Sequence, residues 1–192
     1  MLRYLIRHGA AENVAGRCIG HHDVPLSAEG RATIHRVVDE WRGPPPTRII
    51  TSDLTRALDS ARVFADGWSI PLDTDARLRE LDFGEWEGRT WDALQREDAA
   101  RLSAWMQDWV HIAPPGGESF ETLAARAIGC YHDLGDDTLV VAHAGSIRAI
   151  LCHTNAAPLA RAFDFTVDHA QLHRVTSRSP AAPPRHDRDT DA

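Results

Sequence analysis

The stretch LRYLIRHG at residues 2–9 places a short apolar segment directly before an arginine, a histidine and a glycine. Its apolar part, residues 2–6, is bounded by charge and glycine, which is typical of a buried β-strand. Two similar runs follow, RIIT at 48–51 and TLVVA at 138–142. Helical patterns stand between them, and this alternation predicts a mostly parallel sheet with helices on both faces. The expected fold is therefore α/β, a three-layer α/β/α sandwich.

The remaining elements follow from apolar spacing and from residues that start or stop helices. Expected helices cover residues 28–41 (with Ser27 as its N-cap), 54–66, 91–109 and 120–134, and another begins within 146–153. Residues 163–175 alternate apolar and polar side chains, which predicts a late strand at an edge of the sheet. Residues 177–192 are rich in Pro, Asp and Arg. We expect one domain over 1–176 and a disordered tail over 177–192.

Composition excludes several classes of protein. The chain has 192 residues, of which 43% are hydrophobic and 26% charged, as in an ordinary globular domain. A net charge of -7 argues against non-specific nucleic-acid binding. No apolar run reaches the ~20 residues of a membrane span. Cys18, Cys130 and Cys152 are odd in number and scattered, so we expect reduced thiols in a cytoplasmic protein.

Charged side chains follow each expected strand. Arg7 and His8 come after the first strand, Arg56 follows the second and His143 follows the third. Ligands of open α/β sheets bind at the carboxyl ends of the strands, so these four groups should meet there. Two guanidinium groups match the oxygens of a phosphate dianion. A neutral imidazole among them can attack phosphorus without a metal, and a second can stabilise charge on the phosphoryl oxygens.

Such a reaction also needs a proton donor for the leaving alkoxide. Glu80 is the candidate, because a carboxyl near bound phosphate is pushed toward its protonated form. Asp82, Glu85 and Glu87 compete for this role within the same short segment. Nearby Trp86 could line a pocket for an organic leaving group.

Other histidines and a cysteine are weaker candidates. The sequence His21-His22-Asp23 and the pair His169 and His173 could suggest a metal. The His21-His22-Asp23 sequence has no further carboxylate at a spacing typical of metal ligands. The pair His169 and His173 lies in a segment whose apolar and polar residues alternate as in a strand, so we expect no metal. Cys18 has no adjoining basic partner that would make it a nucleophile.

Four motifs together resemble the histidine phosphatase superfamily, also called the phosphoglycerate mutase-like family. They are LIRHG at 5–9, SDLTRA at 52–57, LRELDFGEWEG at 78–88 and VVAHAG at 140–145. The resemblance implies a phosphohistidine enzyme with no cofactor, acting on a small-molecule phosphate ester. It implies that His8 is the nucleophile, that Arg7, Arg56 and His143 form the phosphate pocket, and that Glu80 is the proton donor. Asn13 and Ala144 are further candidate substrate-binding residues.

Within the superfamily, the sequence is most similar to the α-ribazole phosphatases of cobalamin synthesis. It departs from the family pattern at Ala10, where many members carry an acidic residue, and in a shortened loop over 11–16, which leaves the role of Asn13 open. A short insertion between the helical segments favours hydrolysis over mutase chemistry. A phosphoglycerate mutase-type transfer and a non-catalytic phospho-ligand module are the alternatives. The late edge strand could pair with a second copy, so a homodimer is one expectation.

Overall fold

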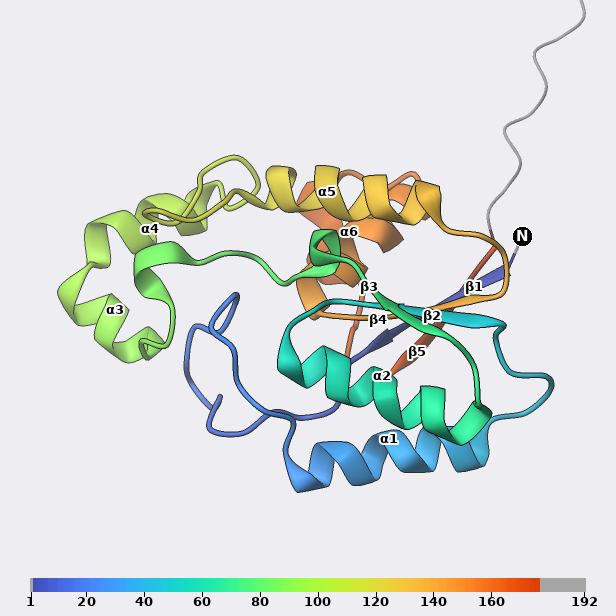
Figure 1. Cartoon of the computed structure of the whole chain (residues 1–192). Helices are drawn as coiled ribbons and strands as arrows, with labels where there is room; N and C mark the ends of the chain where they lie inside the picture. The colour runs from blue at the N-terminus through green and yellow to red at the C-terminus, as the bar shows by residue number, and fades with distance from the viewer. Residues whose placement is uncertain (1, 177–192) are drawn as a thin grey trace, which may run out of the picture.

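A computed structural model describes residues 2–176, which build one five-stranded sheet between helices (Figure 1). The strands are β1 (Leu2–Arg7), β2 (Arg48–Thr51), β3 (Leu72–Thr74), β4 (Thr138–Ala142) and β5 (Leu172–Thr176). Their order is β3-β2-β4-β1-β5; the first four are parallel and β5 is antiparallel to β1. The mostly parallel sheet and the edge strand near the C-terminus are confirmed.

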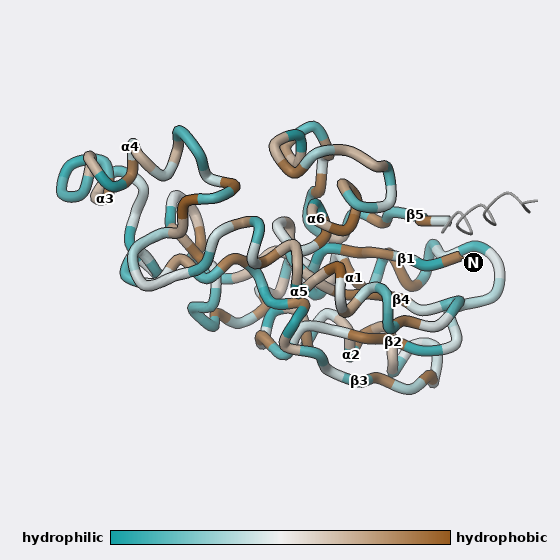
Figure 2. The backbone as a smooth tube through the Cα atoms, turned by 90° about the horizontal axis from the view of Figure 1, so that it is seen from above, coloured by the Kyte–Doolittle hydropathy of each residue, from teal (hydrophilic) through white to brown (hydrophobic). Residues whose placement is uncertain are grey.

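Helices cover both faces of this sheet, as the sequence predicts. The helices are α1 (Ala28–Glu40), α2 (Thr55–Trp68), α3 (Trp91–Glu97), α4 (Ala99–Gln107), α5 (Phe120–Asp133) and α6 (Ala144–Thr154). In Figure 1, α1 and α2 lie below the sheet, and α5 and α6 lie above it. Figures 1 and 2 both place α3 and α4 away from the sheet, at one end of the molecule. Ser27 caps α1 by accepting a hydrogen bond from the Gly30 amide.

The core consists of two layers, one on each face of the sheet. On β1, Leu5 packs with the α5 and α6 layer, whereas its neighbour Ile6 packs with the α1 and α2 layer. On β4, Val140 packs with the α5 and α6 layer, and Leu139 packs with the α1 and α2 layer. Side chains alternate across a strand, so a sheet covered on both faces needs apolar residues at every position. This explains the consecutive apolar residues in the central strands, at 5–6 in β1, 49–50 in β2 and 139–142 in β4, and Figure 2 shows brown segments along β1 and β2.

Two predicted elements differ from the structure, and one strand has no counterpart in the prediction. The helix expected over 91–109 is divided at Asp98, whose carboxylate accepts hydrogen bonds from Trp86 Nε1 and Arg101 Nε, and whose backbone is not helical (φ -142°, ψ 31°). Most of the strand expected over 163–175 is absent, because residues 159–164 form a 3₁₀ helix and pairing with β1 starts at Leu172. Strand β3 was not predicted, since its three residues LDT carry no apolar pattern.

Two further expectations concern the ends of the chain and the membrane. The tail expected over 177–192 lies outside the described residues. The domain boundary expected at residue 176 therefore stays a prediction. Among residues 2–176, none of the helices is both long and apolar enough to cross a membrane.

Candidate active site

His8 and His143 meet at the carboxyl edge of the sheet, as their positions after β1 and β4 predict. Their ring centroids lie 5.0 Å apart. The His8 backbone amide donates to the carbonyl of Ala142, 3.0 Å away, so the two strand exits are joined directly. The Nδ1 atom of His8 lies 2.6 Å from the Gly9 carbonyl. A carbonyl only accepts, so we assign the proton of the neutral ring to Nδ1, which leaves the Nε2 lone pair free for attack.

Arg7 and Arg56 flank His8 and are held by backbone carbonyls. Arg7 Nη1 donates to Val167 O at 2.9 Å. Arg56 Nη2 donates to Gly20 O at 2.6 Å, and its Nη1 donates to His22 O at 3.1 Å. Within residues 2–176, neither guanidinium forms an ion pair with a carboxylate. Both positive charges therefore remain available to an anion.

The electrostatics of the site keep both imidazoles neutral. Burial, followed by the charge of Arg56, holds the pKa of His8 well below its usual range. Burial lowers the pKa of His143 in the same way, with His8 and Arg56 as the next causes. A neutral ring is the nucleophilic form of histidine. The pocket therefore suits attack by His8 at neutral and mildly acidic pH.

His143 lies behind His8 rather than on the cavity surface. Its side chain is fully buried, and neither ring nitrogen has a hydrogen-bond partner among the described residues. A buried polar group without a partner is costly, and such groups concentrate where a ligand completes the bonding. One neutral ring nitrogen carries a proton, so His143 can donate a hydrogen bond to a phosphoryl oxygen next to His8.

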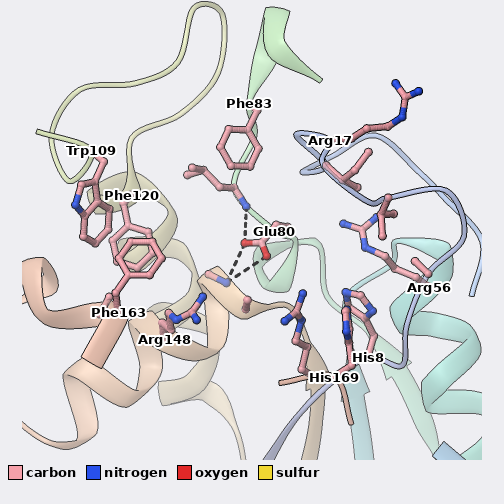
Figure 3. A pocket seen from close by; sticks show the side chains of 18 of the residues that line it. His8, Arg17, Arg56, Glu80, Phe83, Trp109, Phe120, Arg148, Phe163 and His169 are labelled. Atoms are coloured by element: carbon pink, nitrogen blue, oxygen red, sulfur yellow. Dashed lines mark hydrogen bonds between the residues drawn. The ribbon is translucent and has the colours of Figure 1, made fainter. Parts of the chain in front are cut away.

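Glu80 faces the same space from the opposite side (Figure 3). Its Oε1 accepts hydrogen bonds from the backbone amides of Leu81 and Gly145, each at 3.0 Å. A Cβ at position 145 would lie 2.2 Å from Glu80 Oε1, so any larger residue there would displace the carboxylate. The glycine of the VVAHAG motif thus lets the carboxylate reach the first turn of α6.

The structure separates Glu80 from the three carboxylates that compete with it in the sequence. Asp82 accepts from the Gly84 amide, Glu85 pairs with Arg101 at the surface, and Glu87 accepts from backbone amides of the segment 20–22. Of these four acidic residues, Glu80 is the one that lines the cavity.

The cavity has a volume of about 360 Å³ and two chemically different ends. Arg7, His8, Arg56 and Ala144 line the phosphate end. The other end is an aromatic wall, formed by Phe83, Trp91, Trp105, Trp109, Phe120 and Phe163. Arg148 lies between the ends, with its guanidinium 5.0 Å from the Phe163 ring centroid and its Nε donating to Phe165 O.

The structure places two of the predicted substrate-binding residues outside the lining of the cavity. Trp86 was expected to line a pocket, but this is wrong: its side chain is fully buried against Cys18, Leu94 and Leu102, away from the cavity. The strong apolar character of indole places it in a satellite core instead. Asn13 is exposed, with a left-handed backbone (φ 55°), and is not among the cavity-lining residues. Its contact with phosphate stays a prediction.

The other weak candidates have structural roles. Asp23 accepts from the backbone amide and the hydroxyl of Thr55, which fastens its loop to the start of α2. His21 lies 3.6 Å from Asp82. Among residues 2–176, no three His, Cys, Asp or Glu side chains are grouped to hold a metal ion. The Cys18 thiol is buried, which raises its pKa and keeps it protonated.

Sequence reasoning missed His169, Arg148 and most of the aromatic wall. His169 was weighed only as a metal ligand, yet its ring centroid lies 5.4 Å from that of His8. It follows no strand, so the rule that found His8 and His143 could not find it. Arg148 lies one helical turn after Ala144, and this spacing on α6 is the signal that could have found it.

The site agrees with comparisons to known proteins. Residues 3–181 match the family described as histidine phosphatase superfamily (branch 1). An adenosylcobalamin/alpha-ribazole phosphatase from Salmonella typhimurium is 32% identical over 178 residues, which cover 88% of this chain and 86% of that protein. A glucosyl-3-phosphoglycerate phosphatase from Mycolicibacterium vanbaalenii is 34% identical, with 76% and 70% covered.

A solved structure shows the same arrangement in three dimensions. The crystal structure of the alpha-ribazole phosphatase from Shigella flexneri superposes with a TM-score of 0.82 at 29% identity, covering 91% of this chain and 89% of that one. The family match, the related sequences and the shared fold show that this chain belongs to the histidine phosphatase superfamily.

Proposed function

We propose that the protein is a phosphomonoesterase that works through a phosphohistidine at His8. The observation that carries this proposal is the state of the His8 ring, which is buried, neutral and bonded through Nδ1, between two arginines that form no ion pair with a carboxylate within residues 2–176. Membership of a superfamily with phosphatases among its relatives supports the same reaction.

The reaction has two steps. In the first, His8 Nε2 attacks phosphorus, the N–P bond forms, and the bond to the leaving oxygen breaks while protonated Glu80 gives that oxygen its proton. In the second, the Glu80 carboxylate takes a proton from water, whose oxygen attacks phosphorus and breaks the N–P bond. Inorganic phosphate leaves, and both side chains return to their starting states. Arg7, Arg56 and His143 stabilise the phosphoryl oxygens in both steps.

The aromatic wall indicates the kind of leaving group. Six aromatic side chains line the end of the cavity away from His8, which favours an organic group with a flat ring system over a simple sugar or glycerate. The relatives named alpha-ribazole phosphatase point to the same kind of ester. We therefore propose α-ribazole 5′-phosphate, in cobalamin synthesis, as the substrate to test first.

Hydrolysis of p-nitrophenyl phosphate in the presence of EDTA tests the chemistry. Wild-type protein should turn over without added bisphosphate, and His8→Asn should lose at least about a thousandfold in kcat. Phosphate binding without turnover would instead support a non-catalytic binding module. A requirement for a bisphosphate would support the mutase. Full activity of His8→Asn would contradict the proposed nucleophile.

A panel of phosphate esters tests the leaving group. The kcat/KM for α-ribazole 5′-phosphate should exceed that for 3-phosphoglycerate and glucose 6-phosphate. Phe163→Ala should raise KM for the aromatic ester about tenfold and leave the inhibition constant of inorganic phosphate unchanged. Equal kcat/KM values across the panel would contradict a role of the wall in selecting the ester.

Assembly and location remain predictions that experiments can address. Strand β5 is an edge strand that pairs with β1 within the described sheet, and a homodimer through its outer side is testable by light scattering. Three buried, unpaired cysteines support a reducing compartment, and fractionation of cells tests the cytoplasm.

A further inference from the structure

His169 is a histidine at the mouth of the phosphate site that the mechanism above does not use. It lines the cavity, and its ring centroid lies 5.4 Å from that of His8, with the planes inclined by 54°. Figure 3 shows the two rings side by side, both pointing into the cavity. The side chain is exposed at the cavity mouth, and no hydrogen bond from its ring to residues 2–176 occupies it.

The backbone fixes this placement from both sides. Two residues before His169, the Val167 carbonyl accepts from the Arg7 guanidinium at 2.9 Å. One residue after it, the Ala170 amide donates to the Arg7 carbonyl at 3.0 Å. Ala170 adopts a left-handed conformation (φ 58°), which turns the chain sharply into β5. His169 is therefore tied to the same residue that precedes the nucleophile.

The surroundings of His169 favour its neutral form in the free protein and its charged form beside a dianion. Partial burial and the charge of Arg7 lower the pKa of His169 to about 4, and Asp168 opposes them. The charged and titratable groups that line or adjoin the same cavity are Arg7, His8, Arg17, Arg56, Glu80, His143, Arg148 and Asp168. Burial is the larger cause and the charge of Arg7 the second; a phosphate dianion between Arg7 and Arg56 would offset the repulsion from Arg7 and attract a proton to the ring.

We propose that His169 is a further phosphate-binding residue, whose ring takes up a proton when the dianion enters and then donates a hydrogen bond to a phosphoryl oxygen beside His8. The inference rests on the proposed function, because it assumes that phosphate binds at His8. On this proposal, the His169 ring is positively charged when phosphate is bound and neutral when the site is empty. Product release then returns the proton to solvent, which makes departure of phosphate easier at higher pH.

Nitrogen-15 NMR of the histidine rings tests this directly. In wild-type protein, the pKa of His169 should rise from about 4 to its ordinary value or above when inorganic phosphate saturates the site. The spectrum of His169→Gln assigns the resonance. A side chain that only fills space at the mouth would not change its pKa with phosphate, and an unchanged value would overturn the inference.

Phosphate affinity provides an independent measurement. At pH 6, His169→Asn should bind inorganic phosphate about tenfold more weakly than wild type, and the difference should shrink at pH 8. The matched control is His35→Asn, an exposed histidine on α1, which should not differ from wild type. Equal affinity of His169→Asn and wild type at both pH values would contradict the proposal. If wild-type protein neither binds phosphate nor hydrolyses an ester, the proposed function itself fails.

Discussion

Glu80 is the residue whose role can be tested most selectively, because the benefit of a proton donor depends on the leaving group. An alkoxide needs the proton, whereas p-nitrophenolate leaves without it. Glu80→Gln should therefore lower kcat/KM about a hundredfold or more for an alkyl phosphate and much less for p-nitrophenyl phosphate. Because kcat/KM reports only the steps through cleavage of the ester, it excludes the later hydrolysis of the phosphohistidine, in which Glu80 also acts. The measurement is a plot of kcat/KM against the basicity of the leaving group for both proteins.

Glu85→Gln is the matched control, since Glu85 lies five residues from Glu80 but pairs with Arg101 at the surface. It should retain the wild-type dependence on leaving group. An equal loss of kcat/KM for both esters in Glu80→Gln would assign that residue to binding rather than to donation of a proton to the leaving group.

The positions of His8 and His143 could be predicted from the sequence, whereas that of Trp86 could not. A side chain directly after a buried parallel strand lies at the carboxyl edge of the sheet. Trp86 stands in a segment of 3₁₀ helix whose direction depends on distant partners, among them Asp98. Local pattern carries no information about such partners.

At the scale of elements, the loop before α1 depends on the carboxylate of Glu87. Its two oxygens accept backbone amides from Gly20, His21, His22 and Phe83, at distances between 2.8 and 3.0 Å. The same loop offers the carbonyls of Gly20 and His22 to Arg56. Glu87 therefore positions Arg56 through the loop, without touching the cavity.

Glu87→Gln should loosen this loop, because an amide can accept at one oxygen only and its nitrogen faces donors. We expect the free energy of unfolding to fall by about 1–3 kcal/mol and phosphate affinity to fall several-fold. Urea denaturation and phosphate inhibition measure the two effects. Glu85→Gln again serves as control, and a Glu87→Gln protein with wild-type affinity would contradict the positioning role.

Elements were predictable where an apolar run was long or a cap was explicit, as in β4 and at Ser27. Helix α4 and strand β5 were misjudged in extent because tertiary contacts end them. Asp98 is recruited by Trp86 and Arg101, and pairing with β1 begins only at Leu172. Such boundaries are set by partners far away in the sequence.

At the scale of the whole molecule, the buried histidines link stability to pH. The pKa values of His8 and His143 are held well below that of an unfolded histidine, about 6.5, so the folded protein binds fewer protons below that pH. Stability is therefore full above about pH 6.5 and falls as the pH decreases toward the folded values.

When the pH is lowered from 6.5 to 5.5, each of these two histidines should decrease the free energy of unfolding by about 1 kcal/mol. Urea denaturation in buffer without phosphate measures the slope. Replacing His8 by Asn removes one titrating group, so the decrease over this interval should be smaller by about 1 kcal/mol. A stability that rises on acidification would show that these rings are charged in the folded state.

The division of the cavity has a consequence for how this catalyst can change. His8 and His143 follow strands buried in the body of the molecule, whereas Trp91, Trp105 and Trp109 come from the region of α3 and α4, which extends away from it. Substitutions in the region of α3 and α4 can therefore change which ester is bound without altering the residues that cleave it. Laboratory evolution toward new phosphate esters should therefore begin with libraries confined to residues 91–110.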